Sequence, residues 1–375
     1  MAKMLTGLFA ATMATVGIQV VQSPSKPTPP VEAKDRRSAP SKIPTRESKA
    51  GMAIELGTYY FPGWHRDRFF NNRDTWAPIK PYIERRPLKG WYDDTKLSVL
   101  MKQANEMSDA GINFVVFDWY FENGRVQADK PLRNFLGLRG SAPRAALMWA
   151  RHGNSPPTKV EEWRSIVKIW IDYAKSPKFY RIDGHPVVMI FDTGRMAREA
   201  TLAGGSLNEW LSIANSAAKK HGLLSFYFVA GVWNDTDTTI ASLPGTGFRA
   251  LTSYNFKRRS AGHPEVHGYD EMDRLYQTIW PGLVSNAAKL PVILPLTTGW
   301  DRRPWGGSSD PRTDASVATP DQFTNHLQSA RTLMQRTGVR RAVICCWNEY
   351  GEGSLLEPNM GQGTANLNAV KAVFK

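Results

Sequence analysis

The sequence has little cysteine. Its only two cysteines among 375 residues, Cys345 and Cys346, are adjacent. Neighbouring residues of a strand point to opposite faces, so we expect these two to be small buried side chains that do not bridge each other. No zinc-site spacing of cysteine and histidine accompanies them. The cysteines therefore predict neither a disulfide framework nor a structural zinc site.

Glycine-rich phosphate loops and long basic runs are also missing. Neither Gly-x-Gly-x-x-Gly nor a Walker sequence follows any apolar run. The formal net charge is +14, but five of these charges lie in residues 1–50, where eight Lys or Arg face three Asp or Glu. The remaining basic residues include scattered Arg-Arg pairs without a longer run. We therefore predict no nucleic-acid partner.

No apolar run is long enough to predict a membrane span. The mild run from Leu5 to Val21 suits the apolar region of an export signal, with small residues before a cleavage site near Ser23. An unprocessed tail and a weak amphipathic anchor are the alternatives. We expect residues 1–23 to direct export to the periplasm or the exterior, with a cytoplasmic location if they are not a signal. Residues 24–50, rich in proline and scattered charge, are expected to form a disordered linker.

Residues 51–375 alternate between short apolar runs and segments with helical spacing. The apolar runs predict strands at 56–61, 112–119, 145–150, 186–191, 225–230, 248–254, 291–297 and 342–347. Helical spacing predicts helices at 96–110, 160–175, 206–221, 270–288, 320–337 and 364–374, with a weaker candidate at 236–243. Several strands are apolar on both faces, as in a parallel sheet covered by helices. The pattern predicts one (β/α)₈ barrel with loop insertions, and a doubly wound open sheet is the alternative.

Aromatic and polar residues follow each predicted strand, and in a barrel they share one mouth. Rings pack on the C–H faces of a hydroxyl-rich ligand, while carboxylates, amides and imidazoles bond its hydroxyls. Their candidate metal ligands lie on different loops, so we predict no metal site. The predicted substrate-binding residues are Tyr59, Tyr60, Trp64, His65, Asp118, Trp119, Tyr120, Trp149, His152, Asp192, Trp233, Asn234, Tyr254, Trp300, Asp301, Arg302 and Asn348.

These residues also have ordinary interpretations. Tyr59, Tyr60 and Trp119 could fill the barrel, and the histidines could be supporting hydrogen-bond partners. Asp118 could accept backbone N–H groups of a loop. Asp301, beside two arginines, could form a surface ion pair.

The turn after the last predicted strand carries the clearest chemistry. It reads Asn348-Glu349-Tyr350-Gly351-Glu352-Gly353 and places two carboxylates three residues apart at the mouth. Acid–base cleavage of a glycosidic bond needs two carboxyl groups with different pKa values facing one sugar. We therefore predict Glu349 and Glu352 as catalytic residues, against the alternative of solvated turn residues.

Several long motifs resemble the WbsX-like proteins, which are grouped with glycoside hydrolase family 99 as one superfamily. The resemblance covers residues 54–375. The segments that carry it are Tyr59–His65, Pro87–Asp93, Gly111–Tyr120, Gly299–Asp301 and Trp347–Pro358.

The resemblance implies an endo-acting (β/α)₈ glycosidase that cleaves α-mannosidic bonds with retention and without a metal or organic cofactor. By that match, Glu349 deprotonates the sugar 2-hydroxyl, which attacks its own anomeric carbon to give a 1,2-anhydro intermediate. Glu352 protonates the departing oxygen and then activates water. We expect Glu352 to lie in the drier environment, so that its pKa rises. The chain departs from the characterised branch at Gly351, where that branch has His, and at Tyr350, where Trp is usual.

Three functions remain open. The first is a glycoside hydrolase acting on a polysaccharide or oligosaccharide, with Asp118 as the nucleophile if Glu349 is misplaced. The second is a transferase or transglycosylase of polysaccharide biosynthesis, although a nucleotide-sugar donor lacks its phosphate loop here. The third is a non-catalytic glycan-binding barrel. An anionic glycan would be read by arginines on mouth loops, against the alternative of a basic solvated surface. These candidates are Arg125, Arg151, Arg302 and Arg303.

Overall fold

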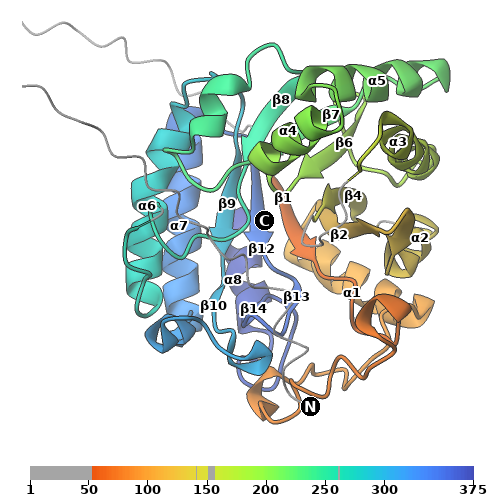
Figure 1. The fold of residues 1–375 in the computed structure, drawn as a ribbon. Coiled ribbons are helices and arrows are strands. Elements are labelled where there is room, and N and C mark those ends of the chain that lie inside the picture. Colours follow the sequence, from red (N-terminus) through yellow and green to blue (C-terminus); the bar gives the residue numbers. More distant parts are fainter. Residues whose placement is uncertain (1–52, 141, 151–156, 261) are drawn as a thin grey trace, which may run out of the picture. The chain divides into compact units, whose positions relative to one another are not determined.

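Parallel strands pair side by side in the order β8-β7-β6-β4-β2-β1-β12-β9 (Figure 1). The computed structural model describes residues 53–375 except 141, 151–156 and 261, so the predicted export signal and linker lie outside the described residues. The eight strands are β1 (Glu55–Tyr60), β2 (Phe114–Glu122), β4 (Arg144–Trp149), β6 (His185–Ile190), β7 (Tyr227–Gly231), β8 (Phe248–Thr252), β9 (Ile293–Thr297) and β12 (Arg341–Cys345).

The two edge strands of this sheet, β8 and β9, nearly close it into a barrel. The backbone N–H of Leu251 donates to the carbonyl of Pro291 at 2.9 Å, and Leu251 forms a parallel bridge with Val292. Closure of a parallel sheet leaves no long exposed edge. The predicted (β/α)₈ barrel is therefore confirmed.

Helices cover the outside of the barrel, with α6 and α7 on one side and α2 and α3 on the other (Figure 1). Within the described residues they are α1 (Leu97–Ala110), α2 (Lys130–Leu136), α3 (Val160–Ala174), α4 (Thr193–Leu202), α5 (Leu207–Lys220), α6 (Tyr269–Val284), α7 (Pro320–Thr337) and α8 (Ala365–Phe374). A 3₁₀ helix, η4 (Thr238–Ser242), replaces the helix after β7. None of the helices in these ranges is long and apolar enough to cross a membrane.

Helices α2 and α4 were not predicted from the sequence. Helix α2 has seven residues and contains Pro131, so it is too short to show a helical period. Helix α4 begins Thr193-Gly194 and buries only four of its ten residues. Both follow strands at the barrel mouth, where loop insertions were expected.

Short added elements make up these insertions. Hairpin partners extend three strands beyond the barrel: β3 (Arg125–Gln127) pairs with β2, β10 (Gly299–Trp300) with β11 (Ser316–Val317), and β13 (Asn348–Glu349) with β14 (Ser354–Leu355). A further strand, β5 (Arg181–Ile182), pairs with β6. The other 3₁₀ turns are η2 (Arg68–Phe70), η3 (Ile83–Arg85), η5 (Arg303–Trp305) and η6 (Pro311–Ala315).

Successive strand residues alternate between two packed layers. Tyr59 of β1 and Val116 of β2 belong to a cluster inside the barrel, whereas Tyr60 and Phe117 belong to the layer between sheet and helices. Side chains of a strand alternate with a period of two, so Asp118 lies on the inner side with Val116. This alternation decides which residue at the end of each strand faces the mouth.

The prediction for the cysteines was wrong, because Cys345 and Cys346 form a disulfide with each other. The prediction assumed that both residues belong to one extended strand with a trans peptide. Strand β12 ends at Cys345, and the peptide bond to Cys346 is cis, which brings the two Cα atoms to 3.0 Å. The pair lies in the inner cluster, directly before the turn that carries the two glutamates.

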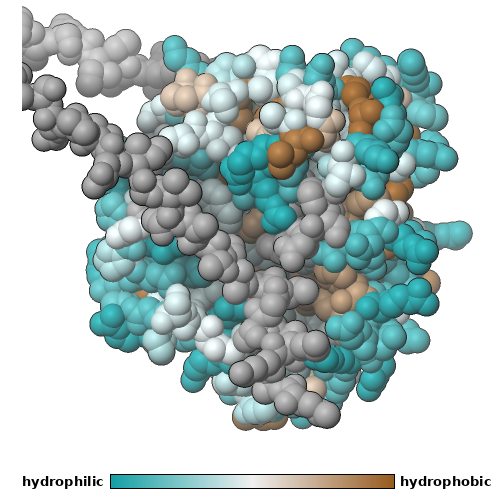
Figure 2. Space-filling model, viewed as in Figure 1, coloured by the Kyte–Doolittle hydropathy of each residue, from teal (hydrophilic) through white to brown (hydrophobic). Residues whose placement is uncertain are grey.

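Hydrophilic residues predominate on the face shown in Figure 2, and hydrophobic ones form separate small areas. Single exposed apolar side chains are usual on a protein surface. Trp233 is 55% exposed, which is unusual for so large a ring. It follows β7 at the mouth of the barrel.

Candidate active site

The turn that follows β12 is a tight hairpin. Asn348 pairs with Leu355 and Glu349 with Ser354 in an antiparallel ladder. Gly353 has φ of 70°, and a Cβ there would lie 2.9 Å from backbone and side-chain atoms of Asp301. Only glycine meets both conditions without displacing its neighbour. Glycine at position 353 therefore allows the chain to turn directly after Glu352.

Asn348 ties this hairpin to β1. Its Oδ1 accepts from the N–H of Phe61 at 2.8 Å, and its Nδ2 donates to the carbonyl of Phe61 at 3.1 Å. The indole N–H of Trp64 donates to the carbonyl of Asn348 at 2.9 Å. Asn348 is fully buried, so its role is to anchor the turn, and the predicted contact with substrate is not supported.

A steric constraint explains the glycine at position 351. A Cβ at this position would lie 2.0 Å from the ring of Trp305. The ring therefore occupies the space that a larger side chain at position 351 would need. The departure from histidine noted in the sequence is matched by this aromatic neighbour.

Three carboxylates meet at the C-terminal end of the barrel. Glu349, Glu352 and Asp118 are only 4%, 8% and 5% exposed. Each has one buried oxygen without a hydrogen-bond partner among the described residues: Glu349 Oε2, Glu352 Oε2 and Asp118 Oδ1. Buried polar atoms are almost always paired, so these oxygens are sites for water or for the hydroxyls of a ligand.

Burial and mutual repulsion shape the ionisation of two of these groups. Burial, then the charges of Glu352 and Asp118, raise the pKa of Glu349 well above its usual value, although the hydroxyl of Tyr254 donates to Glu349 Oε1 at 3.0 Å. Burial, followed by the charge of Glu352, raises the pKa of Asp118 well above its usual value. Burial and the neighbouring negative charges therefore act in the same direction on Glu349 and Asp118, and both favour the protonated form of each carboxyl group.

Glu352 differs because positive charges lie beside it. Burial raises its pKa to about 7, and the charges of Lys257 and Arg302 oppose this rise. The predicted rise in the pKa of Glu352 is confirmed, but Glu352 does not occupy the drier environment, since Glu349 is the less exposed of the two. A carboxyl group with a pKa near 7 is well suited to donate a proton at neutral pH.

Aromatic residues predicted to bind substrate surround the acids on the inner side. Tyr59 donates from its hydroxyl to the carbonyl of Ser253 at 3.2 Å, and its ring lies 4.8 Å from that of Tyr254. Burial, then the charges of Asp118, Glu349 and Glu352, raise the pKa of Tyr120 well above its usual value. The structure therefore brings Tyr59, Tyr120 and Tyr254 together with the carboxylates.

Three other predicted aromatic residues point away from the mouth. The ring of Trp149 lies 5.7 Å from that of Trp163 in α3. Tyr60 and Trp119 also pack against helices, with the Tyr60 hydroxyl donating to Gln103 at 3.0 Å. All three are buried between sheet and helices, so their prediction as substrate-binding residues is corrected. Consecutive residues at a strand end face opposite sides, and the prediction ignored that period.

Asp301 is a structural brace. It is 3% exposed and forms ion pairs with Arg85 and Arg303. Burial would raise its pKa, but the hydrogen bond from Arg303 and the charge of Arg85 outweigh burial and lower it. Arg85 also donates to the carbonyl of Tyr350 at 2.8 Å. Asp301 thus holds the acid turn in place.

The remaining predicted residues have separate positions. Trp300 is buried, with its N–H donating to Ser308 at 2.9 Å and Lys257 Nζ 4.1 Å from its ring centroid. Asp192 caps α4, accepting from the N–H of Arg195 at 2.7 Å. Asn234 is also a local turn residue, with Oδ1 accepting from the N–H of Thr236 at 2.8 Å.

The predicted arginines and histidines lie in different parts of the molecule. Arg303 is paired with Asp301, whereas Arg125 is exposed on β3. His152 and Arg151 lie outside the described residues. Within the described ranges, no group of three or more His, Cys, Asp or Glu side chains is placed to hold a metal ion.

The role of Glu357 was not predicted from the sequence. This side chain is fully buried and accepts from Lys89, Gln103, Tyr92 and Tyr350 at 2.7 to 2.8 Å. The available signal was a glutamate held in an apolar stretch before a proline, within one of the resembling motifs. Its bond to Tyr350 supports the middle of the acid turn.

The chain is similar to several known proteins. The family model described as Glycosyltransferase WbsX matches residues 82–370. A solved glycoside hydrolase-like protein is 16% identical with a TM-score of 0.64, covering 89% of this chain and 97% of its own. The GH99 endo-alpha-mannosidase of Bacteroides thetaiotaomicron, in complex with BIS-TRIS-propane, is 14% identical with a TM-score of 0.61, covering 86% of this chain and 97% of its own. At these identities the likeness shows a shared fold. No curated protein matches the sequence.

Proposed function

This chain belongs to the family described as Glycosyltransferase WbsX, and we propose that it cleaves a polysaccharide or oligosaccharide at the carboxylates of Glu349 and Glu352. One observation carries the proposal. The hairpin turn after β12 holds these two acids beside Asp118 at the barrel mouth. Each acid has one buried oxygen without a hydrogen-bond partner among the described residues. Cleavage of a glycosidic bond uses two neighbouring carboxyl groups, one as the acid and the other as the base or nucleophile.

The resemblance supports a two-step route with retention at an α-mannosidic bond within the chain. Glu349 takes the proton of the sugar 2-hydroxyl, whose oxygen attacks the anomeric carbon as the bond to the leaving oxygen breaks. Glu352 gives its proton to that leaving oxygen. In the second step, Glu352 takes a proton from water as the water oxygen attacks the anomeric carbon. The bond between this carbon and the 2-oxygen breaks, and the 2-oxygen recovers its proton from Glu349. The alternative uses one carboxylate as a nucleophile on the anomeric carbon, with Asp118 available for this role.

A transferase is the second candidate, and the description of the family favours it. The same carboxylate pair would serve if the hydroxyl of an acceptor sugar replaced water in the second step. A nucleotide-sugar donor is less favoured, because the sequence has no glycine-rich phosphate loop after a strand. Hydrolysis and transfer therefore differ in the acceptor, and product analysis distinguishes them.

The test is a screen of α-mannans and other polysaccharides with product sizing by mass spectrometry, run beside Glu352→Gln. We expect oligosaccharide products with the wild type and almost none with the variant, and the α-anomer in the first product detected by NMR. Longer products in excess acceptor sugar would indicate transfer. Products made equally by both proteins would overturn the assignment of the site, and binding without products would favour a glycan-binding barrel.

We expect Lys257→Met to move the alkaline limb of the pH profile of kcat/KM to higher pH. Burial raises the pKa of Glu352 to about 7, and the charge of Lys257 holds it below the value that burial alone would give. Removing that charge disfavours the carboxylate, so the pKa of Glu352 rises further and the acid stays protonated to higher pH. The profile of kcat/KM is the suitable measurement because it reports ionisation of the free enzyme.

Lys168→Met is the matched control for this prediction. Lys168 lies exposed on α3, so its replacement should leave the pH profile in place. An alkaline limb that does not move in Lys257→Met, or that moves to lower pH, would contradict the role of Glu352 as the proton donor.

A further inference from the structure

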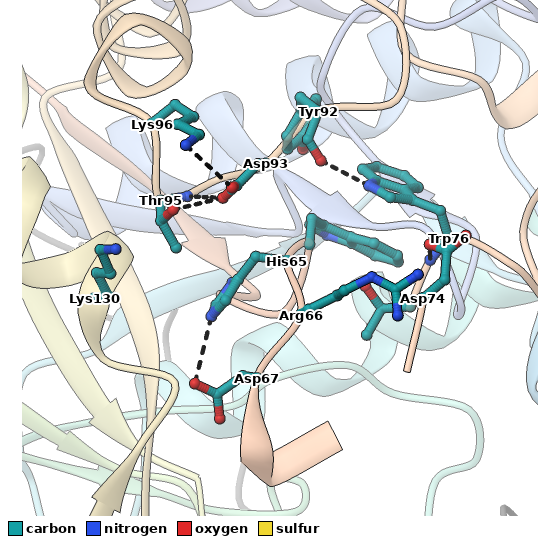
Figure 3. A pocket seen from close by; sticks show the side chains of 12 residues that line it. His65, Arg66, Asp67, Asp74, Trp76, Tyr92, Asp93, Thr95, Lys96 and Lys130 are labelled. Atoms are coloured by element: carbon teal, nitrogen blue, oxygen red, sulfur yellow. Dashed lines mark hydrogen bonds and ion pairs between the residues drawn. The ribbon is translucent and has the colours of Figure 1, made fainter. Parts of the chain in front are cut away.

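A cavity of about 550 Å³ lies between the segment that joins β1 to α1 and the first residue of α2 (Figure 3). The three acids described above are not part of its lining. Its volume falls within the range of small-molecule binding sites. His65, Thr75 and Lys130 contribute to different parts of its wall.

The buried side chain of Asp94 holds the ring of His65 in this wall. Its Nδ1 lies 2.6 Å from Asp94 Oδ1, and the other oxygen of this fully buried aspartate accepts from the N–H of Trp64 at 3.0 Å. This contact assigns a proton to Nδ1 and leaves Nε2 toward the cavity and Asp67 (Figure 3). Nε2 is buried and has no hydrogen-bond partner among the described residues, with Asp67 Oδ2 at 3.7 Å.

Thr75 gives a second free polar group in the same wall. Its hydroxyl oxygen is buried and has no hydrogen-bond partner in the described part of the chain. Thr75 lies ten residues beyond His65, on a separate turn of the β1–α1 segment. Two buried polar atoms without partners in one cavity are explained if an occupant supplies the missing bonds.

The wall of the cavity is joined to the acid turn. The rings of Trp64 and Trp76 stack with centroids 4.1 Å apart, and both also line the cavity. Trp64 donates to the carbonyl of Asn348, the residue before Glu349, and Tyr350 packs edge-on against Trp64 at 5.2 Å. An occupant of the cavity therefore contacts the same support that holds the acids.

The charges of the lining favour a neutral occupant. Its three Lys and Arg side chains are matched in number by three aspartates: Arg66, Lys96 and Lys130 against Asp67, Asp74 and Asp93. Two of these aspartates also have basic partners nearby, since Asp74 lies 2.6 Å from Lys80 and Asp93 lies 3.8 Å from Lys96. A polyanion would gain little from this lining, whereas hydroxyl groups suit its mixed donors and acceptors.

We propose that this cavity is a subsite for a neutral sugar ring of the same glycan, whose hydroxyls bond to His65 Nε2 and Thr75 Oγ1. The proposal rests on the proposed function, because it assigns the cavity to a more distant ring of the chain that the acids cleave. His65 and Thr75 bind and orient this ring, which helps to hold the chain while its scissile bond lies at the acid turn.

Calorimetric binding of α-linked manno-oligosaccharides of increasing length tests the proposal, with Glu352→Gln as the parent protein so that no ligand is cleaved. Adding Thr75→Val removes one hydroxyl and keeps the shape of the side chain. We expect binding of the longer oligosaccharides to weaken by about three- to tenfold, as expected for one lost hydrogen bond, and Thr75→Ser to restore it. Thr332→Val is the control, since the hydroxyl of Thr332 donates within α7 to the carbonyl of Gln328 at 2.9 Å.

A second measurement covers the case in which Thr75→Val does not fold. In ¹⁵N-histidine-labelled parent protein, the Nε2 resonance of His65, assigned with His65→Gln, should shift when the longer oligosaccharide is added. An unshifted resonance, equal affinity of parent and Thr75→Val, or no binding by the parent would overturn the subsite. Failure of the proposed function is separate: the wild type would then cleave nothing, whatever the parent binds.

Discussion

Replacing Glu352 by glutamine is expected to lower kcat by about 10²- to 10⁴-fold on the glycan that the screen identifies. The amide keeps the size of the side chain but cannot give up a proton to the leaving oxygen. Burial raises the pKa of Glu352 to about 7, so the carboxyl group is partly protonated at neutral pH and can donate. KM should change little, because the loss falls on the transition state.

Steady-state kinetics with both proteins measures this effect, and a thermal melt shows whether the variant is folded. Glu55→Gln is the matched control. Glu55 lies at the start of β1, at the opposite end of the barrel, where its carboxylate accepts from Arg341 at 2.6 Å. This control should retain nearly all activity. More than about a tenth of the wild-type rate in Glu352→Gln would contradict an essential acid–base role.

Glu349→Gln should cause a loss of similar size, since the 2-hydroxyl then keeps its proton. The double variant should be little worse than either single variant, because residues that act in one step are not additive. A double variant that loses the product of the two single effects would instead indicate that the glutamates act independently.

The sequence predicted the barrel because strand and helix periods are local signals. The six helices that the periodicity predicted begin within one residue of their predicted starts, since each has an apolar face. The acid turn was also predictable, because two carboxylates follow a buried strand. Its glycines mark the positions where Trp305 and Asp301 approach the backbone.

Contacts between distant segments were not predictable from the same signals. The cysteine prediction relied on strand alternation, which ends at Cys345. The cavity of His65 and Thr75 depends on a long stretch with little regular structure between β1 and α1. The pairing of Asp301 with Arg85 joins residues more than two hundred positions apart. Periodicity carries no information about such pairs, so their roles come only from the folded structure.

The acid turn depends on a buried carboxylate that takes no part in the proposed chemistry. Glu357 accepts four hydrogen bonds, two on each oxygen, from Lys89, Gln103, Tyr92 and Tyr350. These four bonds use the full acceptor capacity of a carboxylate. A single buried anion therefore joins the segment before α1, α1 itself and the middle of the acid turn.

Glu357→Ala should lower the free energy of unfolding by about 3–5 kcal/mol. The change leaves the buried ammonium of Lys89 with one less anion and leaves two tyrosine hydroxyls without their acceptor. Urea unfolding monitored by tryptophan fluorescence measures the loss, provided that the slope of the transition is unchanged.

Glu106→Ala is the matched control, because Glu106 is the other carboxylate bonded to Lys89, at 2.8 Å, and its side chain is 31% exposed. A partly exposed ion pair contributes about 1 kcal/mol or less, so this variant should unfold nearly as the wild type does. Combining Glu357→Leu with Lys89→Met removes both charges and should recover part of the stability lost in Glu357→Ala. Equal losses in Glu357→Ala and Glu106→Ala would mean that Lys89 alone, and not the four-bonded carboxylate, supports the turn.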